Sequence, residues 1–235
     1  MKRAMVKTII LILVIVFVLA GCEEGTTTPS NTQKTGPIVC LGDSLTEGFG
    51  ASKPSEVDKT NSYPAFLEKK VTINVINAGI SGDTAGGGLA RVDKDVLAND
   101  PQVVIILLGG NNFLKLKPAS EAKSELQAII NKVKSEDRKI YLASFIGDDA
   151  WEDSYLKTFP IMPPGIITLL ADYRKIYTEL WSENTGLGQI SNIWKGIGKN
   201  QMSDPIHPNA SGYSIMADNI FSDLRPYLAE NNLLK

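Results

Sequence analysis

The chain of 235 residues has very few of the side chains that bind metal ions through nitrogen or sulfur: one histidine, His207, and two cysteines, Cys22 and Cys40. A zinc site takes three or four protein ligands, drawn mainly from these residue types. Such a site could be built here only with several carboxylates, and no metal-binding framework is visible in the sequence. We therefore expect neither a metal nor an organic cofactor.

An excess of positive charge is also missing. The formal net charge is −2, and it becomes −5 if residues 1–21, which carry three basic residues and no acid, are removed. Proteins that bind nucleic acid through its phosphates need clustered basic side chains. A mildly acidic domain of this kind is not expected to bind nucleic acid.

No hydrophobic run is long enough to suggest a membrane-spanning helix. Residues 8–19 form an apolar run of about a dozen residues, whereas a spanning helix needs roughly 20. With basic residues before it, this run is typical of a secretory signal peptide covering residues 1–21. It ends in Leu19-Ala20-Gly21-Cys22, which resembles the bacterial lipobox, where the cysteine is lipidated and becomes the new N-terminus. The alternative is an ordinary secretory signal in which Cys22 is incidental.

Residues 22–36 are rich in Thr, Ser, Asn and Gly and are expected to form a flexible tether. Residues 37–235 suit a single domain. With Cys22 acylated, Cys40 would have no disulfide partner, and its apolar surroundings predict a buried, inert thiol. We expect a lipid-anchored protein of the bacterial cell envelope that faces outside the cytoplasm, on a membrane that the sequence does not identify.

Short apolar runs alternate with segments of helical periodicity. The runs end in Gly, Asn or Ser and suit strands covered on both faces: 38–41, 72–76, 103–108 and 140–144. Helices are expected at 63–70, near 89–97, at 119–134 with Ser120 as a cap, at 164–181 and at 211–228. This alternation predicts a doubly wound α/β domain with a parallel sheet. Residues 146–164 fit neither period and are expected to form a loop or a partial lid.

The first predicted strand is followed by Gly42-Asp43-Ser44, which places a serine at the mouth of the sheet. A serine hydroxyl becomes a nucleophile when an adjacent base takes its proton. His207 is the only imidazole available, and Asp204, three residues before it, is close enough to orient the ring. Both are followed by proline, which limits the freedom of their loop.

Donors for a developing oxyanion are expected after the next two strands. Gly79 lies in Asn77-Ala78-Gly79-Ile80-Ser81, and Asn111 lies in Gly109-Gly110-Asn111-Asn112. Together with the Ser44 amide, the Gly79 amide and the Asn111 side chain could converge on one point above the sheet. Taken singly, each of these segments could be an ordinary turn or helix cap. Their joint occurrence at predicted strand ends indicates a serine hydrolase.

Four segments together resemble the blocks of the GDSL, or SGNH-hydrolase, family: GDSLTEGFG at 42–50, NAGISGDT at 77–84, GGNN at 109–112 and DPIHPNASGY at 204–213. Residues 63–67 and 75–93 further resemble its bacterial arylesterase, thioesterase I and lysophospholipase branch. The resemblance implies a three-layer α/β/α sandwich with a five-stranded parallel sheet of the flavodoxin-like SGNH type. It also implies Ser44, His207 and Asp204 as the catalytic triad, with Ser44, Gly79 and Asn111 as the oxyanion hole.

One position departs from the family pattern. Asn112 stands where the third block usually ends in aspartate, so the loss of a charge there could alter how Asn111 or the neighbouring loop is held.

Two other classes of protein are disfavoured. The chain has no Gly-x-Ser-x-Gly elbow of an ordinary α/β-hydrolase. Gly86-Gly87-Gly88 lacks the Gly-Lys-Ser/Thr ending of a phosphate-binding loop and is expected to form a loop at the start of a helix.

The predicted activity is two-step acyl transfer from an ester or thioester through an acyl-serine. On the resemblance, the substrates are lipid-like or small carboxylic esters, including lysophospholipids. Two alternatives stay open: a carbohydrate O-acetyl esterase, and a non-catalytic binding module on the same fold.

Overall fold

The computed structural model describes residues 36–148 and 163–235. The predicted signal peptide, Cys22 and residues 22–35 of the predicted tether lie outside these ranges. So does most of the expected loop or lid, since residues 149–162 are not described. Within the described ranges, no helix is both long and apolar enough to cross a membrane.

Five parallel strands form one sheet in the order β2-β1-β3-β4-β5. The strands are β1 (Ile38–Gly42), β2 (Val75–Gly79), β3 (Val103–Leu107), β4 (Lys139–Ala143) and β5 (Gly188–Ile190). Every residue of β1 and β3 is buried, as expected for central strands covered on both faces. The predicted α/β fold and its five-stranded parallel sheet are confirmed.

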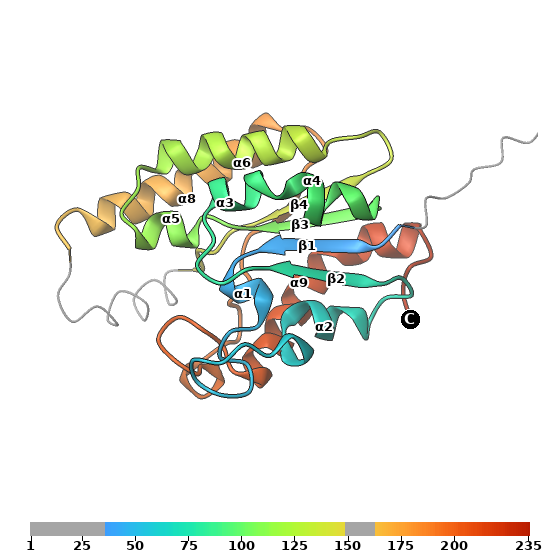
Figure 1. The fold of residues 1–235 in the computed structure, drawn as a ribbon, viewed down its shortest axis with the longest axis horizontal. Coiled ribbons are helices and arrows are strands. Elements are labelled where there is room, and N and C mark those ends of the chain that lie inside the picture. The colour runs from blue at the N-terminus through green and yellow to red at the C-terminus, as the bar shows by residue number, and fades with distance from the viewer. Residues whose placement is uncertain (1–35, 149–162) are drawn as a thin grey trace, which may run out of the picture. The chain divides into compact units, whose positions relative to one another are not determined.

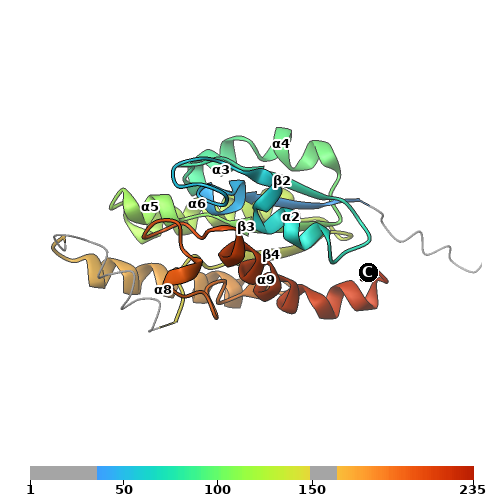
Figure 2. The ribbon, with the colours of Figure 1, turned by 90° about the horizontal axis from the view of Figure 1, so that it is seen from below.

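Helices cover both faces of the sheet (Figure 1). They are α1 (Ser44–Glu47), α2 (Tyr63–Glu68), α3 (Ala85–Ala90), α4 (Val92–Asp95), α5 (Gly110–Leu114), α6 (Ala119–Val133), α8 (Ile166–Glu183) and α9 (Ala210–Glu230), with 3-10 turns at Lys59–Asn61, Leu97–Asn99 and Lys199–Gln201. On one face α6 packs against α3 and α8, and on the other α2 packs against α9 (Figure 2). This is the α/β/α sandwich.

The second strand begins three residues later than the sequence pattern predicts. Thr72 does not join the sheet, because its N–H donates to the Leu233 carbonyl and the neighbouring Val71 pairs with Leu234 near the C-terminus. Pairing with β1 starts at Val75 and runs to Gly79, which lies opposite Gly42. Asn77 and Gly79 are therefore strand residues, and the loop after the strand begins at Ile80.

Two further expectations need correction, and one strand was not anticipated from the sequence pattern. Ser120 does not cap α6, because the helix begins at Ala119 with Pro118 before it and has no side-chain cap. Gly86-Gly87-Gly88 lies inside α3, whose cap is the Thr84 side chain, accepting from the Gly87 N–H at 3.2 Å. The three-residue strand β5 was not predicted from an apolar run, because Gly188 and Gln189 have no apolar side chain.

The prediction for Cys40 is confirmed. Its side chain is fully buried in β1, and burial raises the pKa of the thiol from 9.0 to about 12. A thiol of this kind stays protonated and does not react as a nucleophile at neutral pH.

Candidate active site

Ser44 stands at the carboxyl edge of the sheet because β1 turns directly into α1. The Asp43 side chain caps this helix, with Oδ1 accepting from the Leu45 N–H at 3.1 Å. Gly48 ends the helix after one turn with φ of 97°, a left-handed conformation that glycine adopts readily. The serine is thus the first residue of a one-turn helix at the edge where open α/β sheets bind ligands.

The structure brings Ser44, His207 and Asp204 together across 163 residues of chain. His207 Nε2 lies 3.0 Å from Ser44 Oγ, and His207 Nδ1 lies 2.7 Å from Asp204 Oδ2. An ionised carboxylate only accepts hydrogen bonds, so Nδ1 carries the proton that Asp204 accepts. The Nε2 lone pair then faces the serine hydroxyl, which is the arrangement a general base requires.

Asp204 is held in its ionised form by the loop that carries it. Burial alone would raise its pKa, but hydrogen bonds from the His207 side chain and from the Ile206 and His207 N–H groups lower the pKa below 3.8. Oδ1 accepts these two backbone bonds at 2.8 and 2.7 Å, leaving Oδ2 for the imidazole. The loop also closes on itself, since the Ser203 N–H donates to the His207 carbonyl at 2.8 Å.

Asn111 lies at the same edge, on the first turn of α5. Its Nδ2 donates to Asp43 Oδ2 at 3.2 Å, so the carboxylate that caps α1 also orients this amide. The second hydrogen of the same NH2 group remains for another acceptor. The expectation that Asn111 and Ser44 share one site is met.

Gly79 does not belong to this site. Its N–H donates to Asn77 Oδ1 at 3.0 Å inside β2, and it does not line the pocket beside Ser44. Gly82, three residues later, lines that pocket, and no described group accepts from its N–H. Gly82 lies three residues after Gly79, and the sequence pattern placed the start of β2 three residues too early. A correct strand boundary would have pointed to Gly82.

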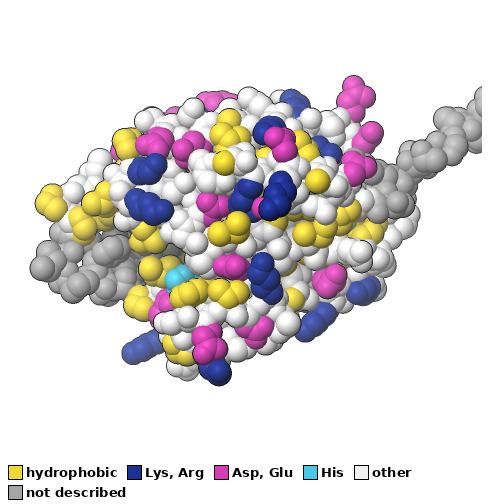
Figure 3. All heavy atoms as spheres, in the orientation of Figure 1, with side chains coloured by type: hydrophobic (Ala, Val, Ile, Leu, Met, Phe, Trp, Pro, Cys, Tyr) yellow, Lys and Arg dark blue, Asp and Glu magenta, His cyan; other side chains and the backbone are white. Residues whose placement is uncertain are grey.

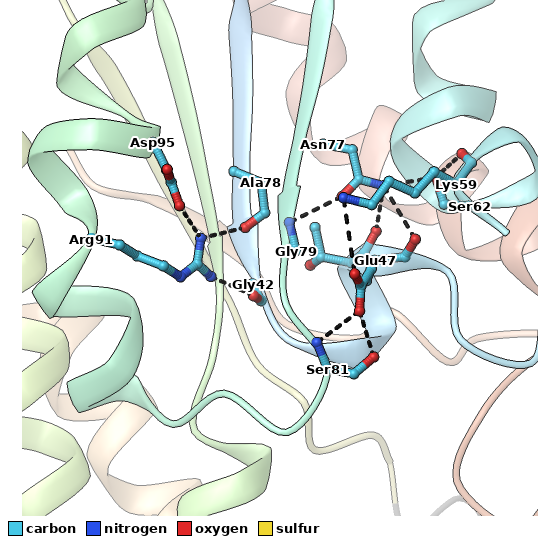
Figure 4. Close-up of polar contacts among 11 residues, drawn as sticks. Gly42, Glu47, Lys59, Ser62, Asn77, Ala78, Gly79, Ser81, Arg91 and Asp95 are labelled. Atoms are coloured by element: carbon cyan, nitrogen blue, oxygen red, sulfur yellow. Dashed lines mark hydrogen bonds and ion pairs between the residues drawn. The ribbon is translucent and has the colours of Figure 1, made fainter. Parts of the chain in front are cut away.

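Glu47, the last residue of α1, fixes the segment that leads to Gly82. Its Oε2 accepts from the Ser81 N–H at 2.8 Å and from the Ser81 hydroxyl at 2.6 Å (Figure 4). Glu47 also ends the helix that begins with Ser44. The distance between Ser44 and the residue before Gly82 is therefore set by one carboxylate.

Arg91 binds the ends of the first two strands together (Figure 4). Its guanidinium donates to the Gly42 carbonyl at 2.8 Å and to the Ala78 carbonyl at 2.7 Å. It also donates to Asp83 Oδ2 at 2.7 Å, which ties in the residue after Gly82. Arginine suits this position because its planar group offers five donors in fixed directions.

A cavity of about 260 Å³ opens beside Ser44. Its described lining is mostly apolar, and the residues that supply this surface are Leu45, Phe49, Leu114, Phe145, Trp194 and Ile206. Phe49 also packs on the imidazole, with ring centroids 4.6 Å apart. In Figure 3 the histidine side chain is visible at the surface with hydrophobic side chains beside it. The site thus joins a polar reactive centre to an apolar pocket, as small-molecule sites commonly do.

The chain was compared with known proteins. The model of the GDSL-like lipase/acylhydrolase family matches residues 40–215. The chain belongs to this family. Membership makes it an ester-bond hydrolase, and the four blocks recognised in the sequence lie within the matched range.

Individual members of the family resemble the chain over most of its length. It is 24% identical to esterase TesA of Pseudomonas aeruginosa over 196 residues, or 81% of this chain and 89% of that protein. It is 27% identical to thioesterase 1/protease 1/lysophospholipase L1 of Escherichia coli over 191 residues, or 80% and 83% of the two chains. A crystal structure of TesA superposes with a TM-score of 0.64 and covers 81% of this chain and 98% of that one.

Asp43 gives this hydrolase an unusual dependence of stability on pH. Only 4% of its surface is exposed, and burial raises the pKa of its carboxyl from 3.8 to about 7, against hydrogen bonds from the Leu45 N–H and Asn111. Between about pH 4 and 7 the folded protein holds a proton that the unfolded chain has released. The contribution of Asp43 to stability therefore falls as the pH rises through this window.

We predict that Asp43→Asn gains stability relative to the wild type as the pH rises from 5 to 8, because the amide has no charge to bury. The relative gain should be on the order of 2 kcal/mol, measured as the difference in free energy of unfolding by urea titration.

Asp58→Asn is the matched control. Hydrogen bonds from Ser52, Thr60 and Asn61 lower the pKa of Asp58, so its contribution is complete at both pH values and is lost only in stronger acid. It should destabilise the protein equally at pH 5 and 8. An Asp43→Asn effect that was also the same at both values would contradict the raised pKa.

Proposed function

We propose that this hydrolase cleaves carboxylic esters through an acyl-enzyme at Ser44, with His207 as general base and Asp204 as the residue that orients it. The observation that carries the proposal is the continuous contact from Asp204 Oδ2 through the imidazole to Ser44 Oγ, at 2.7 and 3.0 Å. It lies at the mouth of an apolar pocket in a member of an esterase family.

In the first step Ser44 Oγ attacks the ester carbonyl carbon while its proton passes to His207 Nε2. Asp204 stabilises the imidazolium without taking its proton. The imidazolium then gives the proton to the leaving alcohol as the C–O bond breaks, which leaves an acyl-serine. Water repeats the sequence, with His207 again accepting and returning a proton, and the acid is released.

We propose Gly82 in place of Gly79 as an oxyanion donor, together with Asn111 Nδ2 and the Ser44 N–H. All three residues line the cavity, and the first amides of a helix such as α1 have no partner inside the helix. Donors fixed in place before the reaction stabilise the charge that develops on the carbonyl oxygen.

The substrate class follows from the pocket. The cavity of about 260 Å³ is slightly smaller than the roughly 300–1,000 Å³ typical of small-molecule sites, which suits a short to medium-length acyl chain. Its apolar lining favours an acyl chain over a sugar. Esters of short to medium-length acids are therefore proposed, and the names of the relatives add thioesters and lysophospholipids as leaving-group variants.

Ser44→Ala and His207→Ala are each predicted to lower kcat for p-nitrophenyl butanoate by at least about 10⁴-fold, because the nucleophile or its base is lost. Asp204→Asn should cost about as much, since it disturbs the tautomer of His207. Asn111→Ala, which removes one oxyanion donor, should cost only about 10²- to 10³-fold. Equal, low activity in the wild type and in all variants would favour a non-catalytic binding module.

We predict that kcat/KM rises from acetyl to about hexanoyl or octanoyl esters and then stops rising. Each methylene buried in the pocket adds about 0.8 kcal/mol until the pocket is full. A series of p-nitrophenyl esters from acetyl to dodecanoyl measures this directly. A maximum at acetyl would instead favour the carbohydrate O-acetyl esterase alternative.

We also propose that the protein is anchored to the cell envelope by a lipid on Cys22, outside the cytoplasm. Support comes from the signal-like residues 1–21 and from the lipobox-like sequence before Cys22. The full chain, expressed in bacteria fed an alkyne fatty acid, should carry the label and fractionate with membranes. Cys22→Ala should abolish the label, and Cys40→Ala should keep it. A labelled Cys22→Ala protein would contradict the anchor.

A further inference from the structure

Asn112 is a fully buried polar residue that connects three helices at the active-site edge. It lies on α5, directly after Asn111. Its Oδ1 accepts from the Ala85 N–H at 2.8 Å, at the start of α3, and its Nδ2 donates to Glu125 Oε2 at 2.9 Å, on α6. Both ends of the amide are thus used, and the two contacts reach two different helices.

These two contacts suit an amide better than an ionised acid. A backbone N–H needs an acceptor, which assigns Oδ1 to Ala85, and the Glu125 carboxylate then needs the donor that Nδ2 supplies. Aspartate at this position would still accept from Ala85, but its second oxygen would face Glu125 Oε2 at hydrogen-bond distance. Two carboxylates in such contact cannot both be ionised.

The surrounding residues fit this arrangement. A Cβ atom at Gly86 would run into the Glu125 carboxylate, so the glycine leaves the space that the acid occupies. Glu125 can therefore reach past the first turn of α3 to Asn112. The residue at 112, the acid at 125 and the missing side chain at 86 form one matched set.

The set lies between the two segments that carry the proposed oxyanion donors. Asn111 precedes Asn112 on α5, and Gly82 precedes Ala85 by three residues, with Thr84 capping α3 between them. A shift of α3 relative to α5 would change the separation of the Gly82 N–H and the Asn111 amide. Misplacement by about 1 Å can cost on the order of 10²-fold in rate.

We propose that the Asn112–Glu125 pair is an amide–carboxylate clamp that positions Gly82 and Asn111 relative to each other. Neither residue lines the cavity beside Ser44, so both are positioning residues. The inference rests on the proposed function, because it concerns the oxyanion donors assigned there.

The test uses four variants of the full chain. Asn112→Asp places two acids in contact. The double variant Asn112→Asp/Glu125→Gln reverses the donor and the acceptor while keeping the net charge, since the amide introduced on α6 can donate to the carboxylate introduced on α5. Glu125→Gln alone keeps an acceptor for Asn112. Glu121→Gln, one turn earlier on α6, removes only a partly buried pairing with Lys117 and serves as the matched control.

For p-nitrophenyl butanoate, kcat of Asn112→Asp should fall at least about tenfold with KM within about twofold, because oxyanion donors act mainly in the transition state. The double variant should regain kcat to within about threefold of the wild type. Glu125→Gln, which keeps an acceptor but loses the carboxylate, should lose less kcat than Asn112→Asp, and Glu121→Gln should stay within about twofold of the wild type. Circular dichroism and thermal midpoints establish that each variant is folded at the assay temperature.

The clamp is overturned if folded Asn112→Asp keeps its kcat within about twofold, or if the folded double variant remains as slow as the single one. Should Asn112→Asp not fold, the double variant decides: a folded and active double supports the clamp, and an unfolded or slow one contradicts it. Failure of the proposed function has a different signature, in which the wild type does not hydrolyse the ester or Ser44→Ala hydrolyses it equally well.

Discussion

The active site depends on the parallel pairing of β1 with the strands on either side of it. In this register Gly42 lies opposite Gly79 of β2 and Leu107 of β3, so three strands end at the same level. The loops that follow carry Ser44, Gly82 and Asn111 to one edge of the sheet. His207 arrives separately, from the loop before α9. A shift of one residue in either pairing would separate these groups.

Polar groups that a stable core would avoid hold this edge together. Arg91 satisfies the carbonyls of Gly42 and Ala78, and Asp43 accepts from both Leu45 and Asn111. Burying such groups costs free energy unless each has a partner. For Asp43 the partners do not offset the cost of burial, as its raised pKa shows. The stability lost there accompanies an Asn111 amide that is oriented before substrate binds.

The site residues that were predicted from the sequence are those whose chemistry can be recognised from a few neighbouring residues. Ser44 follows an apolar strand and a glycine, and His207 is the only histidine, so each could be named without knowing the fold. The prediction of Gly79 depended on where β2 lies along the chain, and the structure places this residue inside the strand, outside the pocket lining. The start of that strand is set by the contacts of Val71 and Thr72 with the C-terminal residues, more than about 160 positions away. No local pattern reports such a contact, and the loop after β2 was therefore expected three residues too early along the chain.

Asn112 also shows that contacts between distant residues cannot be inferred from a local sequence pattern. The sequence revealed that a residue departs from the family pattern, and the natural interpretation was the loss of a charge beside the site. In the structure the charge is still present, because Glu125 brings a carboxylate from α6 to within 2.9 Å of the Asn112 amide. The acid beside this position therefore comes from a second helix. A sequence motif describes single positions. Here the interaction joins two residues that are 13 positions apart and depends on the space left by Gly86. The effect of asparagine at this position on the site depends on how well its amide bonds to its partners. Both contacts of the Asn112 amide have ordinary hydrogen-bond distances, 2.8 Å to the Ala85 N–H and 2.9 Å to Glu125.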